Sequence, residues 1–406
     1  MGVDVSDSGS LWLRRADLAE QAIQRRHAQK LWGMPGTNLA VVTWPPGTKD
    51  RLFWHWHYWW QAHYLDCLVD AALREPTKAR RQRIQHTLRA LSMRTVNRLT
   101  SNKYYDDKAW LALAWNRALA LDGIRRTQAL DNLEFDLLAG IDPVTGVLPW
   151  RRGETFYNVP SNGPAAILFA RTGRLDKSRQ VLDWIFDNLV RENGLLEDGI
   201  RMRMHGPEIV EKIYTYNQGT VLGASLEVAL ALRNEVGLAH DEPIDSFANS
   251  ERADASVFYI THIRAIVQAI ALHLATPRGV IFSPKYESGD GDGGLFKGIL
   301  ARYLAEVAVR MPEDSRENIA TKRVAARLIR ASAESLWQHR LEVDGLPVFA
   351  AEWTEDAKLP HNYGLGPASI SEAVGLLRID ERDLSVQLSG WMLLEAAARI
   401  SSAPGL

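Results

Sequence analysis

Two adjacent aspartates, Asp106 and Asp107, are the residues in this sequence best suited to chemistry. They stand in the segment YYDDKAW, where an apolar helical pattern begins. Two carboxyl groups this close cannot both ionise cheaply where water is partly excluded, so the pKa of one is raised while that of the other stays low. Glycoside hydrolysis requires such a pair, one as the acid and one as the base or nucleophile. The same residues also suit a helix N-cap followed by a first-turn acid, and the local sequence leaves both interpretations open.

A tryptophan-rich segment, FWHWHYWWQAHYLD, occupies residues 53–66, and five of the 14 tryptophans lie in it or just before it. At helical spacing Trp56 and Trp60 share one face, and Trp59 and His63 share another. Such a segment is either an aromatic core helix or a wall on which sugar rings stack. Its histidines lack the HExxH spacing of a zinc site, so no metal is expected.

Two further segments carry side chains that suit a ligand rich in hydroxyl groups. One is the sequence YNQG, which leads into an apolar helix, and the other is the loop that precedes GPAAILFA. Amide and phenol groups both donate and accept hydrogen bonds, as sugars do, although an asparagine here could equally cap a helix. The candidates are Trp150, Asn158, Asn162, Tyr216, Asn217 and Gln218.

The glycine-rich segment GDGDGGLFKGI, residues 289–299, does not match a metal or phosphate site. Asp290 and Asp292 resemble the start of a calcium loop, but the sixth-position glycine and twelfth-position glutamate are out of register. Lys297 follows a glycine-rich turn that lacks the GK[ST] ending of a phosphate loop. We therefore expect no metal and no cofactor.

The elements that must position these residues are helices. Amphipathic periodicity predicts twelve of them, and no alternating run is long enough to build a sheet. Short turns alternate with long loops, which are usually functional. This predicts an all-α toroid of six helical hairpins, an (α/α)6 barrel, whose inner ring surrounds a pocket capped by the long loops. An open solenoid would need a fixed repeat, which is missing. We expect one domain over 1–406, with 1–12 flexible. The predicted helices cover 14–32, 55–74, 76–98, 107–121, 124–139, 161–172, 174–192, 216–235, 251–275, 294–311, 315–340 and 381–400, and the long loops cover 142–160, 193–215, 276–293 and 341–365.

Composition narrows the class of protein. The 406 residues carry 48 Lys and Arg against 49 Asp and Glu, which argues against nucleic-acid binding. The single cysteine, Cys67, excludes an internal disulfide and a CxxC zinc site, and no GxSxG motif is present. No stretch approaches the ~18 uncharged apolar residues of a membrane helix, and the N-terminus lacks the apolar region of a secretory signal. We expect a cytoplasmic protein without a membrane span; its oligomeric state is not indicated.

Taken in order along the chain, these motifs resemble glycoside hydrolase family 76, the endo-α-1,6-mannanases. The segment YYDDKAWLALAW is similar to the family's Tyr-Asp-Asp-x-Ala-Trp segment, which carries both catalytic carboxylates. NVPSNGPAAILFAR resembles its Asn-rich loop and Pro-Ala-Ala helix, IYTYNQGTVLGASLE its Tyr-Asn-Gln-Gly stretch, and LFKGILARYL its Phe-Lys-Gly-Ile segment. YWWQAHYLD also fits an early inner helix of that family.

The resemblance implies an (α/α)6 barrel that hydrolyses α-1,6-linked mannosides with retention of configuration. Asp106 would be the nucleophile that forms a glycosyl-enzyme, and Asp107 would protonate the leaving oxygen and then activate water. A retaining pair needs carboxyl groups about 5–5.5 Å apart, rather than the roughly 6.5–9.5 Å of inverting enzymes. The helix N-terminus is expected to keep Asp106 ionised, and that charge should raise the pKa of Asp107.

The same resemblance implies a set of substrate contacts. Indole rings would stack on mannose, and the amides and phenols would bind hydroxyl groups. The predicted contacts are Trp59, Trp60, Tyr105, Trp150, Asn158, Asn162, Tyr216, Asn217, Gln218, Asp292 and Lys297.

The sequence also departs from the family, and two other functions stay open. Lys108 follows the aspartate pair where a small or polar residue is expected, and it could modulate the pKa of the pair. Family members are typically secreted, so a short intracellular oligosaccharide is as plausible a substrate as mannan. A sugar epimerase would need two histidines in one pocket, but His262 and His273 are eleven residues apart, about three helical turns. A non-catalytic glycan-binding protein could have lost either aspartate, and both are present.

Overall fold

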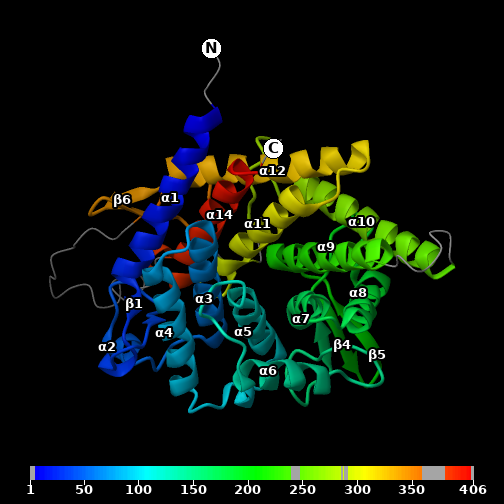
Figure 1. Ribbon diagram of the computed structural model, residues 1–406, viewed down its shortest axis with the longest axis horizontal. Helices are drawn as coiled ribbons and strands as arrows, with labels where there is room; N and C mark the ends of the chain where they lie inside the picture. Colours follow the sequence, from blue (N-terminus) through cyan, green and yellow to red (C-terminus); the bar gives the residue numbers. More distant parts are fainter. Residues whose placement is uncertain (1–4, 239–246, 285–286, 288–290, 359–379, 404–406) are drawn as a thin grey trace.

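The structure is a computed structural model that describes residues 5–238, 247–284, 287, 291–358 and 380–403. It confirms the predicted (α/α)6 barrel (Figure 1). Six inner helices pack side by side in chain order, and the last one closes the ring against the first. The inner helices are α3 (Tyr58–Arg74), α5 (Tyr105–Ala118), α7 (Val159–Arg171), α9 (Thr215–Leu238), α11 (Gly293–Arg310) and α14 (Leu384–Ser401).

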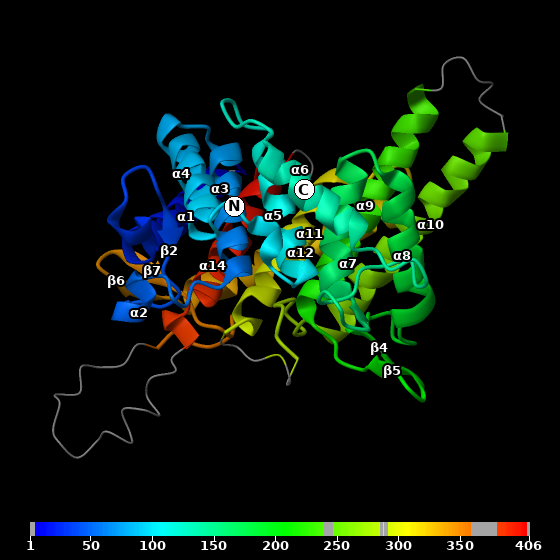
Figure 2. The same ribbon diagram turned by 90° about the horizontal axis from the view of Figure 1, so that it is seen from below.

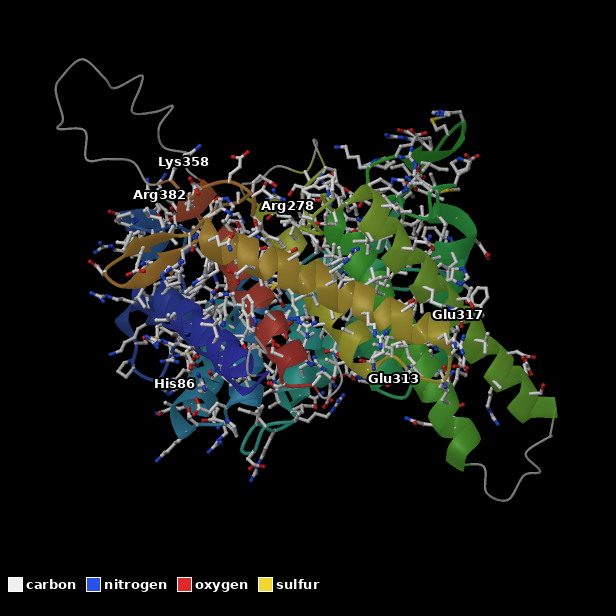
Figure 3. All side chains as sticks on the ribbon, turned by 90° about the horizontal axis from the view of Figure 1, so that it is seen from above. His86, Arg278, Glu313, Glu317, Lys358 and Arg382 are labelled. Atoms are coloured by element: carbon white, nitrogen blue, oxygen red, sulfur yellow. The ribbon has the colours of Figure 1, made fainter. Side chains whose placement is uncertain are left out.

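The outer layer contains the other six predicted helices. Each packs against one or two inner helices, and Figure 3 shows α12 lying along the outside of the barrel, with Glu317 near its first turn. The outer helices are α1 (Val5–Arg26), α4 (Lys78–Arg94), α6 (Gln128–Ala139), α8 (Leu175–Leu189), α10 (Phe247–His273) and α12 (Arg316–Gln338).

Helix starts follow local capping chemistry. The Thr77 hydroxyl accepts from the backbone N–H of Arg80 at the start of α4, and Ser315 accepts from Asn318 at the start of α12, both at about 3.1–3.2 Å. These side chains satisfy N–H groups that have no partner within the helix. Short turns connect α3 to α4, α7 to α8 and α11 to α12, as at 172–174, where Gly173 adopts a φ of +75°.

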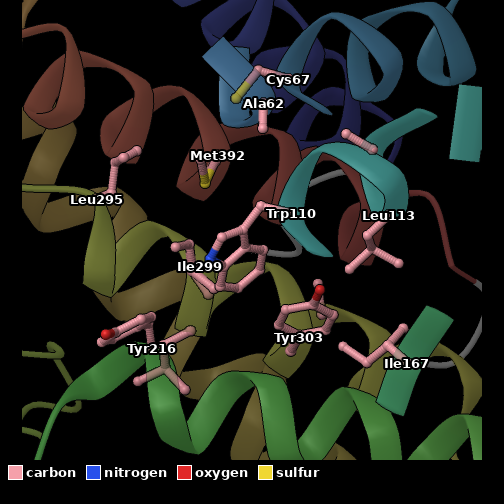
Figure 4. Packing of buried hydrophobic residues seen from close by; sticks show 14 of the residues in the cluster. Ala62, Cys67, Trp110, Leu113, Ile167, Tyr216, Leu295, Ile299, Tyr303 and Met392 are labelled. Atoms are coloured by element: carbon pink, nitrogen blue, oxygen red, sulfur yellow. The ribbon is translucent and has the colours of Figure 1, made fainter. Parts of the chain in front are cut away.

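Side chains from all six inner helices fill the barrel interior. Figure 4 shows Trp110 of α5 at the centre of this packing, with residues of the other five inner helices around it. Trp110 is only 4% exposed. The inner helices are covered on one side by the outer helices and on the other by the barrel core. They are therefore apolar around most of their circumference, and their amphipathic pattern is weak.

The long loops hold short strands that the sequence did not predict. They form a three-stranded antiparallel sheet and two antiparallel pairs; strands 199–203 and 206–210 of the sheet lie at the lower right of Figure 2. With two to five residues each, these strands are too short to show an alternating pattern. The sheet contains β3 (Phe156–Asn158), β4 (Gly199–Arg203) and β5 (Gly206–Val210), and the pairs are β1 (Ala28–Gln29) with β2 (Leu39–Ala40), and β6 (Leu341–Val343) with β7 (Leu346–Val348).

Four inner helices fix these loops with a buried amide near their N-terminal end. The Gln61 amide of α3 accepts from the N–H of Ala40 at 2.9 Å and donates to its carbonyl at 2.8 Å. One side chain thus satisfies the two backbone groups that a neighbouring strand would otherwise bond. The same arrangement joins Asn162 to Leu148, Gln218 to Leu196, and Gln387 to Phe349.

Between the middle and the C-terminal ends of the inner helices, four charged side chains form a closed ring. Asp66 and Asp70 of α3 each accept from both Arg117 of α5 and Arg302 of α11. These side chains are at most 14% exposed. Because α5 and α11 are not neighbours in the inner ring, the four residues cross the barrel interior. A cavity of about 920 Å³ lies beside them, lined in part by Asp70, Arg117 and Arg302.

The N-terminal segment differs from the expectation that residues 1–12 are flexible. Helix α1 already begins at Val5, and Trp12 is buried. The guanidinium of Arg15 lies 4.5 Å from the Trp12 ring and bonds to Glu334 of α12. Trp12 and Arg15 thus pack this part of α1 on the barrel; residues 1–4 lie outside the described part.

One described helix is, by length and composition alone, long and apolar enough to cross a membrane. It is Ser250–His273 of α10, in which Arg264 interrupts the uncharged run. About half of its apolar window, 44%, is buried, since α10 packs against α9 and α12. Length and composition alone are weak support for a membrane span.

We predict that Arg117→Met destabilises the protein by about 3–5 kcal/mol, because Asp66 and Asp70 then keep their charges with one partner fewer. Guanidinium denaturation followed by circular dichroism measures this change. The matched control is Arg203→Met, which removes an ion pair with Glu208 whose side chains are 50% and 48% exposed. The control should cost less than about 1 kcal/mol. Equal shifts for the two variants would contradict a stabilising role of the ring.

Candidate active site

Asp106 and Asp107 are the second and third residues of α5, at the loop end of the barrel. The helix start is held by the loop that contains Trp150: the N–H of Tyr105 donates to the Trp150 carbonyl at 3.0 Å. Tyr104 and Arg151 pair as an isolated antiparallel bridge beside it. A helix N-terminus favours negative charge, so this position suits carboxylates.

Both carboxylate oxygens of Asp106 accept hydrogen bonds. Oδ1 accepts from the backbone N–H of Asp107 at 2.8 Å, and Oδ2 accepts from the indole N–H of Trp150 at 2.9 Å. Burial nevertheless raises the pKa of Asp106 to about 6, against the lowering effect of these donors. The N–H donors at the helix start and on the indole lower the pKa enough that Asp106 is ionised at neutral pH. Burial has the larger effect on this pKa, and the sequence did not reveal that burial.

Asp107 has a different environment. Its Oδ2 accepts one side-chain hydrogen bond, from Asn102 Nδ2 at 2.5 Å. Asn102 Oδ1 accepts from the N–H of Tyr104 at 3.0 Å, which fixes the orientation of the amide. Burial and the charge of Asp106 raise the pKa of Asp107 well above its usual value. The two groups therefore titrate in linked steps, with Asp107 as the member that holds the proton.

Lys108 and Tyr105 contact each other and residues at the C-terminal end of α6. The Lys108 ammonium bonds to Asp136 at 2.5 Å and lies 3.9 Å from the centre of the Tyr105 ring. That ring packs against Gly140, where an added Cβ would come within 2.3 Å of it. Burial and Asp106 outweigh the lowering effect of Lys108 on the pKa of Asp107. The structure thus gives Tyr105 a packing role in place of the predicted sugar contact.

Asp292, at the N-cap of α11, holds the two tryptophans at the start of α3. Its Oδ1 accepts from Trp59 Nε1 at 2.9 Å and from Trp60 Nε1 at 2.8 Å. Trp60 is 3% exposed, and the His57 ring stacks on it at 4.3 Å. Trp60 therefore has no open face for a sugar, contrary to the prediction, whereas Trp59 is partly exposed.

Tyr216 lies close to the aspartate pair. Its ring stacks on Phe296 at 3.9 Å with an interplanar angle of 12°. Burial raises its pKa, and the negative charges of Asp198 and Asp106 add to this. Phe296 was part of a recognised motif, but its role as the ring beneath Tyr216 depends on the meeting of α9 and α11, which sequence alone does not show.

The sequence also missed Asp198, a buried acid directly before β4. Its Oδ1 accepts from Asn217 Nδ2 at 3.1 Å, and burial raises its pKa to about 6. The Oδ1 of Asn217 is buried without a hydrogen-bond partner among the described residues. An aspartate followed by glycine in a long loop carries no signal by itself, so Asp198 could not be distinguished from a turn residue.

Four of the predicted sugar-binding residues are occupied by contacts within the protein. Asn158 caps α7 by accepting from the N–H of Ser161, and Asn162 and Gln218 hold loop residues as described above. The Lys297 ammonium bonds to the Ala351 carbonyl at 2.7 Å and to Glu352 at 2.9 Å. All four are at most 2% exposed. Their polar groups would suit a sugar, but because they are buried they bond to other parts of the protein and hold those parts in place. Asn162, for example, fixes Leu148, two residues before Trp150.

The sequence profile described as glycosyl hydrolase family 76 matches residues 16–384. The chain belongs to this family. The match includes the aspartate pair, the Asn-rich loop and the segment that carries Phe296, and it confirms the resemblance drawn from these motifs. No curated protein sequence matches this family 76 chain.

Several solved structures share its fold. One is an inactive variant of the α-1,6-mannanase of Salegentibacter sp. HEL1_6, in which two consecutive aspartates are replaced by asparagine and α-1,6-mannotriose is bound. It is 24% identical to this chain, with a TM-score of 0.73. The match covers 96% of this chain and 99% of that one. The Lin0763 protein of Listeria innocua is 24% identical, with a TM-score of 0.70 and coverage of 95% and 97%. A family 76 glycoside hydrolase from Bacteroides thetaiotaomicron is 13% identical, with a TM-score of 0.69 and coverage of 95% and 77%. At these identities the likeness establishes the shared fold.

The two carboxyl groups should respond separately to loss of their donors. Trp150→Phe removes a donor to the Asp106 carboxylate, and Asn102→Ala removes the donor to Asp107. Since a hydrogen bond to the charged form lowers a pKa, each variant should raise the pKa of its own partner more than that of the other. Carbon-13 NMR titration of labelled aspartates, assigned with Asp106→Asn and Asp107→Asn, measures both values. Trp184→Phe, whose ring packs on Tyr157, is the control and should change neither; an equal rise of both pKa values in Trp150→Phe would contradict the assignment of donors.

Proposed function

We propose that this family 76 glycoside hydrolase cleaves α-1,6-linked mannosides with retention of configuration, with Asp106 as nucleophile and Asp107 as acid and base. The observation that carries the proposal is the unequal environment of the two carboxyl groups. Asp106 accepts from two N–H donors, whereas Asp107 accepts from one and also experiences the charge of Asp106. A related fold that binds α-1,6-mannotriose supports the choice of substrate.

In the first step, a carboxylate oxygen of Asp106 attacks the anomeric carbon while the bond to the leaving oxygen breaks. The proton of Asp107 moves to that oxygen, and the sugar is left as a glycosyl ester on Asp106. In the second step, Asp107 takes a proton from water as the water oxygen attacks the anomeric carbon. Asp106 is released as a carboxylate and Asp107 regains its proton.

The change of role of Asp107 follows from its coupling to Asp106. While Asp106 is charged, that charge helps to hold the pKa of Asp107 well above its usual range, and Asp107 can act as an acid. Ester formation removes the negative charge from Asp106, so the pKa of Asp107 must fall. Asp107 then loses its proton more readily and can act as the base for water.

The substrate contacts in this proposal are fewer than those that the sequence implied. Trp59 is the partly exposed ring beside the pair, and Asp292 fixes its orientation through the indole N–H. Trp150 contacts the nucleophile directly. Tyr216 is 8% exposed and is influenced by the charges of Asp198 and Asp106, so its phenol is the next candidate for a hydroxyl group of the sugar. Asn217 is fully buried and donates to Asp198, but its Oδ1, unlike the amide oxygens of Asn162 and Gln218, has no partner among the described residues.

The epimerase alternative has no support from the structure. His262 and His273 both belong to α10, an outer helix. The His262 ring packs on Phe186 and Phe258, with ring centres 4.0 and 4.3 Å apart. His273, the last residue of this helix, is exposed.

Proton NMR of the purified protein with linear α-1,6-mannotetraose tests the proposal. We expect the α-anomer of the product to appear first, and we expect Asp106→Asn and Asp107→Asn to abolish turnover. The control is Asp131→Asn, which alters an exposed ion pair on α6 and should leave turnover unchanged. If the β-anomer appears first, Asp106 is not a nucleophile. Binding without cleavage would favour another mannoside linkage or a non-catalytic glycan-binding protein.

Azide rescue separates the roles of the two aspartates in the same assay. With an aryl mannoside whose leaving group needs no acid, Asp107→Ala should still form the glycosyl ester, and azide should then give the α-mannosyl azide. Asp106→Ala leaves space for azide to attack directly, which should give the β-mannosyl azide. The opposite pair of products would exchange the two assignments.

A further inference from the structure

Two tryptophans differ from the others in their exposure. All 14 lie in the part of the chain that the structure describes, and only Trp32, at 50%, and Trp54, at 64%, are more than about a third exposed. Leu52 is 42% exposed. We call the surface formed by Trp32, Leu52 and Trp54 the tryptophan patch. The other twelve tryptophans are buried or partly buried, so the grouping of the two most exposed indole rings suggests a ligand.

The three residues form one surface because direct contacts tie two chain segments together. Trp32, in the short 3-10 helix η1 (Leu31–Gly33), donates its indole N–H to the Leu52 carbonyl at 2.9 Å. Phe53 is fully buried between Leu52 and Trp54, and its carbonyl accepts from Arg94 at 3.1 Å. Leu52 and Trp54, on either side of Phe53, thus face outward. Their Cα atoms are at most about 7 Å apart, because two residues of extended chain span no more than that.

Backbone strain fixes this arrangement. Trp32 has a φ of +50° and Phe53 a φ of +53°, in the left-handed region that bulky residues rarely adopt. Each such residue costs about 1–3 kcal/mol, and strain of this kind gathers at ligand sites. A surface with no ligand would gain nothing from holding an exposed indole in this conformation.

The patch is continuous with the candidate active site. It follows α2 (Thr48–Arg51) and precedes α3, whose second residue is Trp59. Trp59 is five positions after Trp54, so their Cα atoms are at most about 18 Å apart. Trp59 in turn bonds to Asp292, whose charge raises the pKa of both Asp106 and Asp107. A chain of a few sugar units that leaves the aspartate pair can therefore reach the patch.

The chemistry of the patch suits a sugar chain. Indole faces bind the apolar faces of sugar rings, and the exposed residues Lys49, Arg51 and His55 beside them offer donors for hydroxyl groups. The surface consists of three residues, which is small for a stable contact with a second copy of the chain.

We propose that the tryptophan patch is a second glycan-binding surface, which holds a part of the mannoside chain distant from the aspartate pair. The identity of the sugar rests on the proposed function. The patch adds affinity for long substrates because the second contact is made within an already bound chain.

The test compares a polymer with a short substrate. The Trp32→Ala, Trp54→Ala double variant should raise KM for linear α-1,6-mannan by roughly tenfold, as expected for the loss of two stacking contacts, and leave kcat and KM for mannotetraose unchanged. Affinity electrophoresis in mannan gels, on the inactive Asp107→Asn background, measures binding apart from turnover. Trp54→Phe, which keeps a ring, should restore most of the retention. The control is Phe135→Ala, which removes a ring that is 71% exposed on α6.

Trp54→Ala alone is a second variant in case the double variant folds poorly. The outcomes distinguish a second glycan surface from a failure of the proposed function and from self-association. If wild type cleaves mannan and the patch variants bind and process it equally well, the second surface is refuted while the proposed function stands. If wild type neither binds nor cleaves any mannan, the proposed function fails, and the sugar assigned to the patch fails with it. If the double variant changes the molecular mass in solution, measured by light scattering, the patch is a self-association surface instead.

Discussion

The six inner helices point their N-terminal ends toward the same end of the barrel, and the placement of charge in the molecule depends on this common direction. The partial positive charge of a helix N-terminus favours the aspartate pair at the start of α5, and the long loops that must surround a substrate enter at the same end. Further from the loops, the ring of Asp66, Asp70, Arg117 and Arg302 crosses the interior. Arg117 lies in the last turn of α5, where a positive charge complements the opposite partial charge.

The pKa values of the two aspartates result from two opposing effects. Burial raises both pKa values, and N–H donors lower them unequally. Trp150 is the donor that comes from another element, so the state of Asp106 depends on the position of a loop. That position rests in turn on Asn162, which bonds both backbone groups of Leu148. The path from Asn162 to Asp106 explains why a fully buried asparagine contributes to the site without contacting a sugar.

The sequence predicted the helices and the aspartate pair because both are local patterns. The twelve barrel helices were predicted from their periodicity, with bounds that differ by several residues, most of all at α1; the four-residue helix α2 was not predicted. The roles of the polar residues were not predictable, because Gln218 and Asn217 are neighbours of similar chemistry, and only the fold shows that one braces a loop while the other faces Asp198. Trp60 shows the same limit: its indole type suggested stacking on a sugar, but His57 and Asp292 already occupy its ring face and its N–H. The role of Asn102 as a donor to Asp107 could have been inferred from its position just before the helix start. The role of Asp198 could not, because its contact with Asn217 joins two segments that are distant in the sequence.

The most direct test of the account is to identify the residue that carries the sugar in the intermediate. A fluorinated mannosyl fluoride that forms the glycosyl ester quickly and releases it slowly would trap this state, and mass spectrometry of the digested protein would locate the added mass. The account predicts a single label on Asp106, formed in wild type and absent from Asp106→Asn. A label on Asp107, or turnover of the unmodified substrate with no labelled peptide at all, would contradict it.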